Sequence, residues 1–343
     1  SAGSVYFYTL TDGSATWNFA QKIVAPDVEE ADFFGHSVAI DGNHLFVGSY
    51  GDDDGGSQSG SVYLFSLTDF GTLDYVQKLV ASDATAHATF GVAVAVSENH
   101  LVVGAIGDDD FAGAAYIFRT SDGGDSWVQI LKVVADDGAA DAWFGHSVAI
   151  DGNIIVVGAV LDDGFSTNAG AAYVFVLSEG RWTQSQKIVA PDAAYYDYFG
   201  VSVAVAGNVV VVGSIDDDDA GGSSGSAYVY RQTNGTTNGT TWEFSQKLVA
   251  SDASSYDQFG YSVALSGDQV FVGANEDDAD RGSAYIFSWE SCAEMAMSDA
   301  AGDGWNGAFY TFTSVTYDEV VETGTLALGS SGSDEVCLLK GCY

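Results

Sequence analysis

The sequence predicts an all-β repeat fold, because one short pattern recurs five times at a nearly constant spacing. Each copy has a Phe-Gly pair, an alternating apolar strand, a tight turn and a second strand ending in Val-Gly, followed by acidic residues. The pairs are Phe34-Gly35, Phe90-Gly91, Phe144-Gly145, Phe199-Gly200 and Phe259-Gly260, with separations of 56, 54, 55 and 60 residues. Such a period is typical of architectures in which no unit buries its apolar face alone.

Each copy also predicts four strands. In the first copy, residues 37–40 alternate in polarity, Asp41-Gly42-Asn43 forms a hairpin-type turn, and residues 45–48 return as a second strand. Residues 60–65 and 73–80 add a third and a fourth strand. Four antiparallel strands per unit, without a helical period, indicate the blades of a β-propeller, with a parallel β-helix ranked well below it.

The number of blades does not follow directly from the number of repeats. Residues 3–8 and 17–24 match the third and fourth strands of a blade, while the fifth copy has no clear fourth strand. We expect five full repeats and a split sixth blade assembled from both termini, with five or seven blades left open. The unmatched strands could instead pair with another copy of the chain, and contacts that do not close would give a filament.

The composition is strongly acidic and excludes two classes of partner. The 343 residues include 48 Asp and Glu against 10 Lys and Arg, for a formal net charge of −38. A polyanion repels nucleic-acid phosphates and anionic lipid headgroups. No apolar run approaches the roughly 20 residues that span a bilayer, so membrane insertion is not expected.

One lysine position recurs in every repeat. Five of the six lysines occupy the fourth strand of a unit, at Lys22, Lys78, Lys132, Lys187 and Lys247. In so acidic a chain this recurrence predicts a structural ion pair with acids of a neighbouring unit, since a lysine stem lies on apolar surface while its ammonium reaches a carboxylate.

Clustered acids after the second strand are candidate calcium ligands. Ca²⁺ takes six to eight oxygen ligands, which carboxylates and nearby carbonyls supply. The candidates are Asp52, Asp54, Asp108, Asp110, Asp162, Asp163, Asp216, Asp218, Glu276 and Asp278. The alternative is that these acids only cap and hydrogen-bond the loop, as Asp does in turns.

The repeated sequence pattern resembles the FG-GAP repeat of integrin-α-type β-propellers over residues 1–289, which implies a propeller domain. The matching segments of the last repeat are Gln246-Lys247, Ala250-Ser251-Asp252, Phe259-Gly260, Ser262-Val263-Ala264, Val272-Gly273-Ala274 and Gly282-Ser283-Ala284-Tyr285. The integrin-type calcium loop is absent, because a tight turn such as Asp41-Gly42-Asn43 stands in its place. The family's calcium ligands therefore do not carry over to this sequence.

Residues 290–343 are predicted to form a second, small β domain. The segment Gly302-Asp303-Gly304-Trp305-Asn306-Gly307 resembles a disulfide-bearing β module of secreted algal and microbial surface proteins. The resemblance implies a Cys292–Cys337 disulfide, which leaves Cys342 unpaired or in an intermolecular bond.

Two sequons favour secretion and N-linked glycans. Asn234-Gly235-Thr236 and Asn238-Gly239-Thr240 lie in the longest insertion between strands, so Asn234 and Asn238 are candidate glycosylation sites. We therefore expect an extracellular protein at the cell surface or in a matrix.

No catalytic constellation stands out, so we predict no catalytic residues and no enzyme. The leading function is a structural or adhesion protein whose propeller makes protein–protein contacts and self-associates through its terminal strands. The alternative is a calcium-dependent, lectin-like module in which Tyr195 and Tyr196 stack on glycans. A propeller glycosidase is a minor alternative, since paired carboxylates arise by chance among 48 acids.

Overall fold

A computed structural model describes residues 2–10, 16–234, 240–277 and 281–288, together with four strands nearer the C-terminus. By contacts the chain divides into two compact units. The first comprises Ser1–Leu265 and Val270–Ile286, and the second comprises Ser266–Gln269 and Phe287–Tyr343. No helix among the described residues is both long and apolar enough to cross a membrane.

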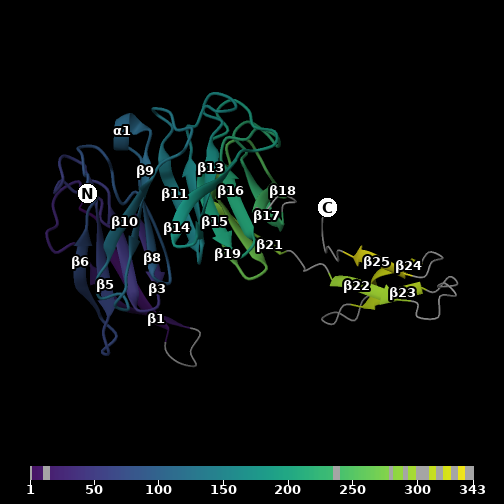
Figure 1. Ribbon diagram of the computed structural model, residues 1–343, viewed down its shortest axis with the longest axis horizontal. Helices are drawn as coiled ribbons and strands as arrows, with labels where there is room; N and C mark the ends of the chain where they lie inside the picture. The colour runs from purple at the N-terminus through teal and green to yellow at the C-terminus, as the bar shows by residue number, and fades with distance from the viewer. Residues whose placement is uncertain are drawn as a thin grey trace. The chain divides into compact units, whose positions relative to one another are not determined.

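Five successive sheets of the first unit form the blades of a β-propeller, and Figure 1 shows them following one another along the chain. Blades 1 to 4 each have four antiparallel strands, and blade 5 has three. Blade 1 contains β3 (Ser37–Asp41), β4 (His44–Ser49), β5 (Ser61–Leu67) and β6 (Leu73–Leu79). Blade 2 contains β7 (Ala93–Ser97), β8 (His100–Ala105), β9 (Ala114–Arg119) and β10 (Val128–Val133).

The later blades repeat this order. Blade 3 contains β11 (Phe144–Asp151), β12 (Ile154–Ala159), β13 (Ala171–Ser178) and β14 (Arg181–Ile188). Blade 4 contains β15 (Phe199–Ala206), β16 (Val209–Ser214), β17 (Ser226–Asn234) and β18 (Thr240–Leu248). Blade 5 contains β19 (Phe259–Ser266), β20 (Gln269–Ala274) and β21 (Ser283–Ser288). The prediction of four-stranded antiparallel blades is confirmed for blades 1 to 4.

The expected split sixth blade is not confirmed. β1 (Val5–Leu10) and β2 (Trp17–Ile23) pair with each other in a two-stranded sheet, here called the N-terminal sheet, and with no other described strand. In the second unit β22 (Ala293–Ser298) pairs with β25 (Ser331–Val336), and β23 (Phe309–Thr313) pairs with β24 (Val320–Thr325). Cys292, Cys337 and Cys342 lie outside the described residues, so the disulfide remains a prediction.

The Phe-Gly pair joins each unit to the one before it. Gly60, which precedes β5, forms a parallel bridge with Phe90 of blade 2, and the same bridge recurs at every junction from Gly3–Phe34 to Gly225–Phe259. The backbones approach so closely that a Cβ on Gly158 would lie 2.0 Å from the carbonyl oxygen of Gly200 in the next blade. The glycine of the Val-Gly pair in one blade and the glycine of the Phe-Gly pair in the next therefore allow the two backbones to approach closely.

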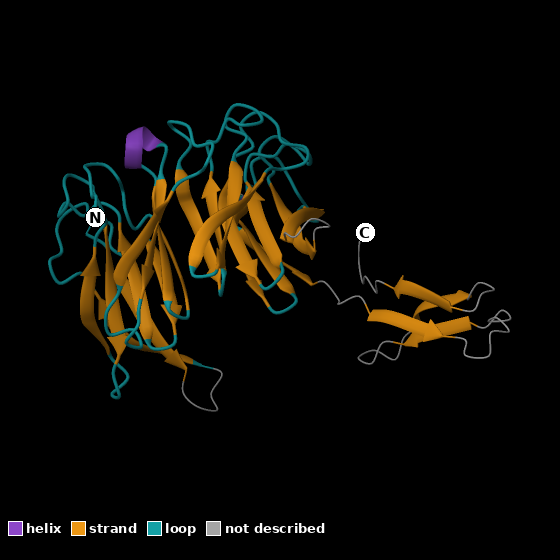
Figure 2. Cartoon of the chain, in the orientation of Figure 1, coloured by secondary structure: helices purple, strands orange, loops and turns teal. Residues whose placement is uncertain are grey.

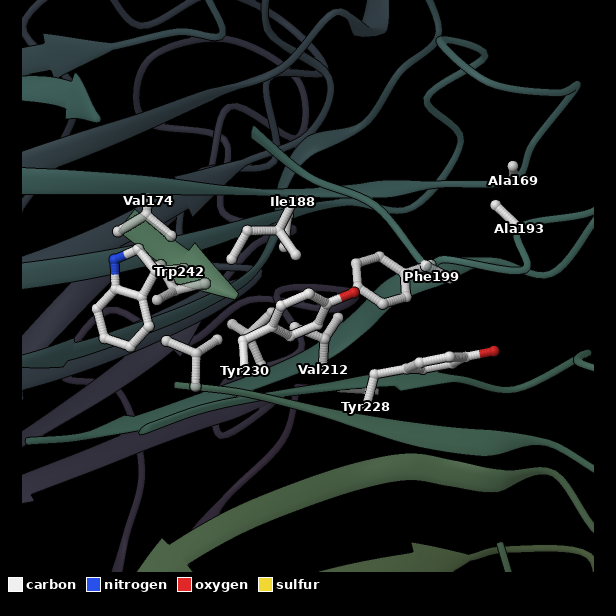
Figure 3. Packing of buried hydrophobic residues seen from close by; sticks show 14 of the residues in the cluster. Ala169, Val174, Ile188, Ala193, Phe199, Val212, Tyr228, Tyr230 and Trp242 are labelled. Carbon is white, nitrogen blue, oxygen red and sulfur yellow. The ribbon is translucent and has the colours of Figure 1, made fainter. Parts of the chain in front are cut away.

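The apolar core lies between blades. Figure 3 shows the junction where Val174 and Ile188 of blade 3 face Phe199, Tyr228 and Trp242 of blade 4. All these residues are at most 3% exposed. The Phe199 and Tyr228 rings pack edge to face with centroids 5.4 Å apart. In blades 1 to 4, one face is thus buried by the preceding unit and the other face by the following unit.

Candidate functional site

Lysine, tyrosine and aspartate side chains form a repeated cluster at one end of the blades. Figure 2 shows that the long loops gather at one end of the blades, and the loop after β4, which contains Asp52, belongs to this end. At blade 1, Lys78 Nζ lies 2.9 Å from Asp27 Oδ2 and 2.8 Å from Asp52 Oδ2. The Tyr63 hydroxyl lies 2.7 Å from an oxygen of each carboxylate. Asp27 belongs to the link that enters blade 1 from the N-terminal sheet. The cluster therefore ties one unit to the next.

The antiparallel register explains why the same cluster recurs. Tyr63 pairs with Val47 across β4 and β5 and with Lys78 across β5 and β6. The side chains of Tyr63 and Lys78 therefore lie side by side on one face of the sheet. The corresponding clusters are Lys132 with Asp83, Asp108 and Tyr116; Lys187 with Asp137, Asp162 and Tyr173; and Lys247 with Asp192, Asp217 and Tyr228. The predicted inter-unit ion pair of these four lysines is present.

The electrostatics of the cluster favour its charged form. Burial alone would raise the pKa of Asp52, but hydrogen bonds from Lys78 and Tyr63 outweigh burial and lower it below the ordinary value. The pKa of Tyr63 is raised by burial and by its two carboxylate partners. Burial opposes the charge on Lys78, yet its bonds to Asp52, Asp54 and Asp27 raise its pKa. Ammonium and carboxylates therefore remain ionised together at neutral pH.

Only some of the predicted calcium ligands belong to these clusters. Asp52, Asp108 and Asp162 are the buried carboxylates of blades 1 to 3, each 4–5% exposed. In blades 4 and 5 the equivalent residues are Asp217 and Asp277, each next to a residue that the sequence analysis singled out. A fixed spacing in the sequence could have identified these buried aspartates. Each of them lies four residues after the recurring glycine near the end of the second strand of its blade, as Asp52 does after Gly48.

A second set of acids was missed altogether. It comprises the aspartates on the links between units, at Asp27, Asp83, Asp137, Asp192 and Asp252. Each of them lies five residues after a repeated lysine, so the period could have revealed them. In blade 5 the Tyr285 hydroxyl lies 2.8 Å from Asp252 Oδ1 and 2.7 Å from Asp277 Oδ2.

Other candidate ligands shape the loops or stand apart from the clusters. Asp163 Oδ1 accepts a hydrogen bond from the Asn168 N–H at 2.7 Å, and Asp218 Oδ1 accepts one from the Ser223 N–H at 2.7 Å. These bonds agree with the alternative that the acids cap the loop. Asp216 is partly buried, and its carboxylate accepts a hydrogen bond from the Ser223 side chain. Asp110 lies in the short helix α1 (Asp108–Phe111), Glu276 is exposed and Asp278 lies outside the described residues.

Two clusters bring three carboxylates together. Oxygens of Asp27, Asp52 and Asp54 lie within 4.8 Å of one another, as do those of Asp192, Asp217 and Asp219. Lys78 Nζ contacts all three acids of the first group, and Lys247 Nζ contacts all three of the second. The ammonium therefore occupies the position between the carboxylates, and a cation could enter only if the lysine moved away.

Exposed aromatic side chains surround the same end of the blades. This surface, here called the loop face, includes Phe111, Phe165, Tyr195, Tyr196 and Tyr256, which are 38–68% exposed. Backbone bonds hold the links against the loops of the preceding blade, as when the Tyr196 N–H donates to Thr167 O at 3.0 Å. The Tyr195 and Tyr196 rings lie 4.0 Å apart at 86°, so they do not present one flat platform.

A cleft of 690 Å³ opens on the loop face at blade 2. Its lining includes Asp83, His87, Asp108, Asp109, Phe111 and Lys132. The sequence analysis did not predict it, because the loop after β8 is three residues shorter than its counterpart in blade 1 and folds into the single turn α1.

The candidate glycosylation sites lie between β17 and β18. Asn234 is the last residue of β17, and its backbone pairs with Thr240. Asn238 lies outside the described residues. Because β17 starts beside the loop face, its last residue lies at the opposite end of blade 4.

Comparison with known families identifies the repeats. A model of the FG-GAP repeat matches residues 17–65, 74–118, 127–175, 182–230 and 242–287. These segments cover more than half of the chain, which therefore belongs to the FG-GAP repeat family. Each match begins in a fourth strand or, in one case, one residue before it, and ends in the third strand of the next unit, so it spans one junction.

Individual relatives are distant. The chain is 22% identical to mouse (Mus musculus) integrin alpha-M over 227 residues, which are 61% of this chain and 18% of the integrin. A candidate 6-phosphogluconolactonase of Bacteroides uniformis has a similar structure, with a TM-score of 0.56 at 11% identity over 98% of this chain and 82% of that one. Sqt1 of Saccharomyces cerevisiae gives a TM-score of 0.47 at 12% identity over 98% and 79%.

Replacing one lysine of a cluster tests its structural role. Lys187→Met leaves Asp162, which is buried, without its ammonium, so we expect the free energy of unfolding to fall by about 1–3 kcal/mol. Lys22→Met is the matched control, since exposed Lys22 occupies the same repeat position and forms no ion pair within the described residues. Chemical denaturation of both variants gives the comparison, and equal losses would contradict the structural role.

The buried carboxyl of Asp197 predicts that stability falls as the pH rises. Burial raises its pKa to about 6, although the Ala194 N–H donates to it at 2.6 Å. An acid whose pKa is raised on folding costs stability above pH 6 and costs none below about pH 4. Asp197→Asn should therefore raise the melting temperature by a few degrees at pH 7.5 and leave it unchanged at pH 4. A pH-independent difference between the two melting curves would refute this assignment.

Proposed function

We propose that this chain is a non-enzymatic extracellular scaffold at a cell surface or in a matrix, which binds protein partners through the loop face and associates with copies of itself. The observation that supports it best is the set of exposed aromatic side chains on the loop face, among them Tyr195 at 60% and Tyr256 at 68% exposure. Aromatic residues are enriched at protein interfaces, where they bury a large area at a small entropic cost.

The charge of the loop face suggests the chemistry of the partner. Exposed acids such as Asp163 and Asp218 lie among the aromatic rings, and the whole chain has a net charge of −38. A partner with exposed arginine or lysine would gain from charge complementarity, chiefly in its association rate. The FG-GAP membership and the similarity to an integrin alpha chain support a protein-binding role, although the chain spans less than a fifth of that integrin.

The absence of catalysis is part of the proposal. Four of the recurring lysines are engaged with carboxylates and tyrosine hydroxyls in clusters that hold neighbouring units together. The structural similarity to a candidate lactonase is at 11% identity and concerns the fold, which is shared by proteins of many functions. The extracellular location is supported by the two sequons in the β17–β18 connection, where N-linked glycans would be attached.

A second candidate is a calcium-dependent glycan-binding module. The two groups of three carboxylates around Lys78 and Lys247 favour it, since each brings acidic oxygens within 4.8 Å of one another. It requires the lysine to yield its place to the ion. The exposed ring of Tyr195 would then stack on a sugar.

Substituting the two neighbouring tyrosines tests the loop face. Tyr195→Ala with Tyr196→Ala should weaken binding of a protein partner at least tenfold without lowering the melting temperature, because both rings are exposed. Phe70→Ala, at a 94% exposed ring on the β5–β6 turn, is the control. Partners captured from extracellular extracts and measured by surface plasmon resonance give the comparison. A loss of stability alone would mean that the rings serve packing.

Removal of calcium separates the two candidates. If the carboxylate groups hold Ca²⁺, EDTA should lower the melting temperature by several degrees and abolish binding to a glycan array. If lysine is the resident cation, both readings stay unchanged. Lys78→Met with Lys247→Met provides the control, since it vacates the position between the acids, so added Ca²⁺ should then stabilise the variant.

A further inference from the structure

The turns opposite the loop face enclose two cavities at consecutive blade junctions. This end of the blades, here called the turn end, is formed by the turns that join the first strand to the second and the third strand to the fourth. One cavity, of 290 Å³, lies between blades 1 and 2, and the other, of 420 Å³, lies between blades 2 and 3. The larger volume falls within the range of about 300–1,000 Å³ that is typical of small-ligand pockets.

The two cavities have equivalent walls. His44 lines the smaller cavity together with Trp127 of the next blade, and His100 lines the larger one together with Trp182 of the next blade. Each histidine is the first residue of the second strand of its blade, and each tryptophan lies five residues before the repeated lysine. The turn at residues 98–99, between β7 and β8, lines both cavities. The cavities are therefore neighbours that share one wall.

Each cavity has a buried hydrogen-bond donor in its wall. Trp127 is 2% exposed and Trp182 is 7% exposed, and neither indole Nε1 has a hydrogen-bond partner in the described part of the chain. The His100 ring packs edge to face on Trp182, with centroids 5.6 Å apart, which holds the indole in place. Trp242 has the same unpaired N–H, but Ile154 stands at the position of the histidine there. A buried N–H without an acceptor is destabilising, so a ligand that brings an acceptor is favoured.

The larger cavity presents donors, acceptors and groups that act as either. Arg119 is exposed, offers only donors and forms no ion pair with a described residue. Glu98 is also exposed and offers only acceptors, whereas the amides of Asn99 and Asn153 both donate and accept. Burial lowers the pKa of His100, so at pH 7 the imidazole is neutral, with one nitrogen that donates and one that accepts.

One side of the larger cavity is apolar. Ile130, at 48% exposure, and Leu177 line it together with the ring of Trp182. A sugar ring has the same division, because its hydroxyl groups both donate and accept hydrogen bonds while its C–H groups form an apolar face. A neutral sugar is also not repelled by the net charge of −38.

We propose that the turn end binds a neutral oligosaccharide, with one sugar unit in each cavity and the turn of Glu98 and Asn99 between the two units. This site goes beyond the proposed function, since it lies at the opposite end of the blades from the loop face. It requires no calcium, because the chain itself supplies both the donors and the acceptors. Acidic sugars are disfavoured, since a carboxylate or a sulfate would meet Glu98 in either cavity.

Removal of single side chains in the full chain tests the site. Glu98→Ala removes an acceptor from both cavities, and Arg119→Ala removes donors from the larger one. Each variant should bind the oligosaccharide about tenfold or more weakly, the effect of losing a hydrogen bond to a charged group. Both side chains are exposed, so the thermal melts should match that of the wild type. Arg231→Ala, at the same repeat position as Arg119 but in blade 4, is the matched control and should bind as the wild type does.

An array of neutral and acidic oligosaccharides, probed in EDTA and again in Ca²⁺, gives the first readout, and calorimetric titration of the best neutral oligosaccharide gives Kd. In ¹H–¹⁵N spectra the indole N–H resonance of Trp182, assigned by its absence in Trp182→Phe, should shift on binding. Failure to bind any neutral oligosaccharide, binding that EDTA abolishes, binding confined to acidic oligosaccharides, or an unchanged Kd in Glu98→Ala would overturn the site. Tyr195→Ala with Tyr196→Ala should leave this binding intact, so the site and the loop-face function stand or fall separately.

Discussion

The apolar packing of each blade against the next one is the contact on which the structure depends. A sheet of four short strands has two apolar faces and cannot bury either by itself. At the junction of blades 3 and 4, valine and isoleucine from one blade meet tyrosine, phenylalanine and tryptophan from the next. The core is thus distributed over junctions, and each unit is stabilised mainly by its neighbours.

The Lys–Tyr–Asp cluster adds direction and register to this apolar contact. Aromatic and aliphatic surfaces alone allow neighbouring sheets to slide, whereas a buried carboxylate that accepts bonds from both Lys78 and Tyr63 fixes one arrangement. The link aspartate, as in Asp27, brings the preceding unit into the same network. In a chain with 48 acids and six lysines, placing four of the lysines at such clusters also relieves repulsion where the carboxylates are most crowded.

The loop face combines this rigid support with an adaptable surface. The strands beneath it are fixed by the junctions, while the loops above them differ in length, as the short turn α1 in blade 2 shows. Exposed rings such as Tyr195 and Phe165 stand on these loops between acidic residues. Binding residues on loops over a regular scaffold are a common arrangement, because loop changes there leave the core intact.

The sequence by itself determined the repeat, the four-stranded blade and the inter-unit role of the lysines, because strand alternation and a 54–60 residue period are local signals. It did not identify Asp217 or the link aspartates, since which of several adjacent acids turns inward depends on the loop path. Tertiary structure also decided that β1 and β2 form their own sheet and that Tyr6 and Ile286 are exposed. Residues with the same repeat position are buried or exposed according to whether a neighbouring unit covers them, and only the three-dimensional arrangement contains that information.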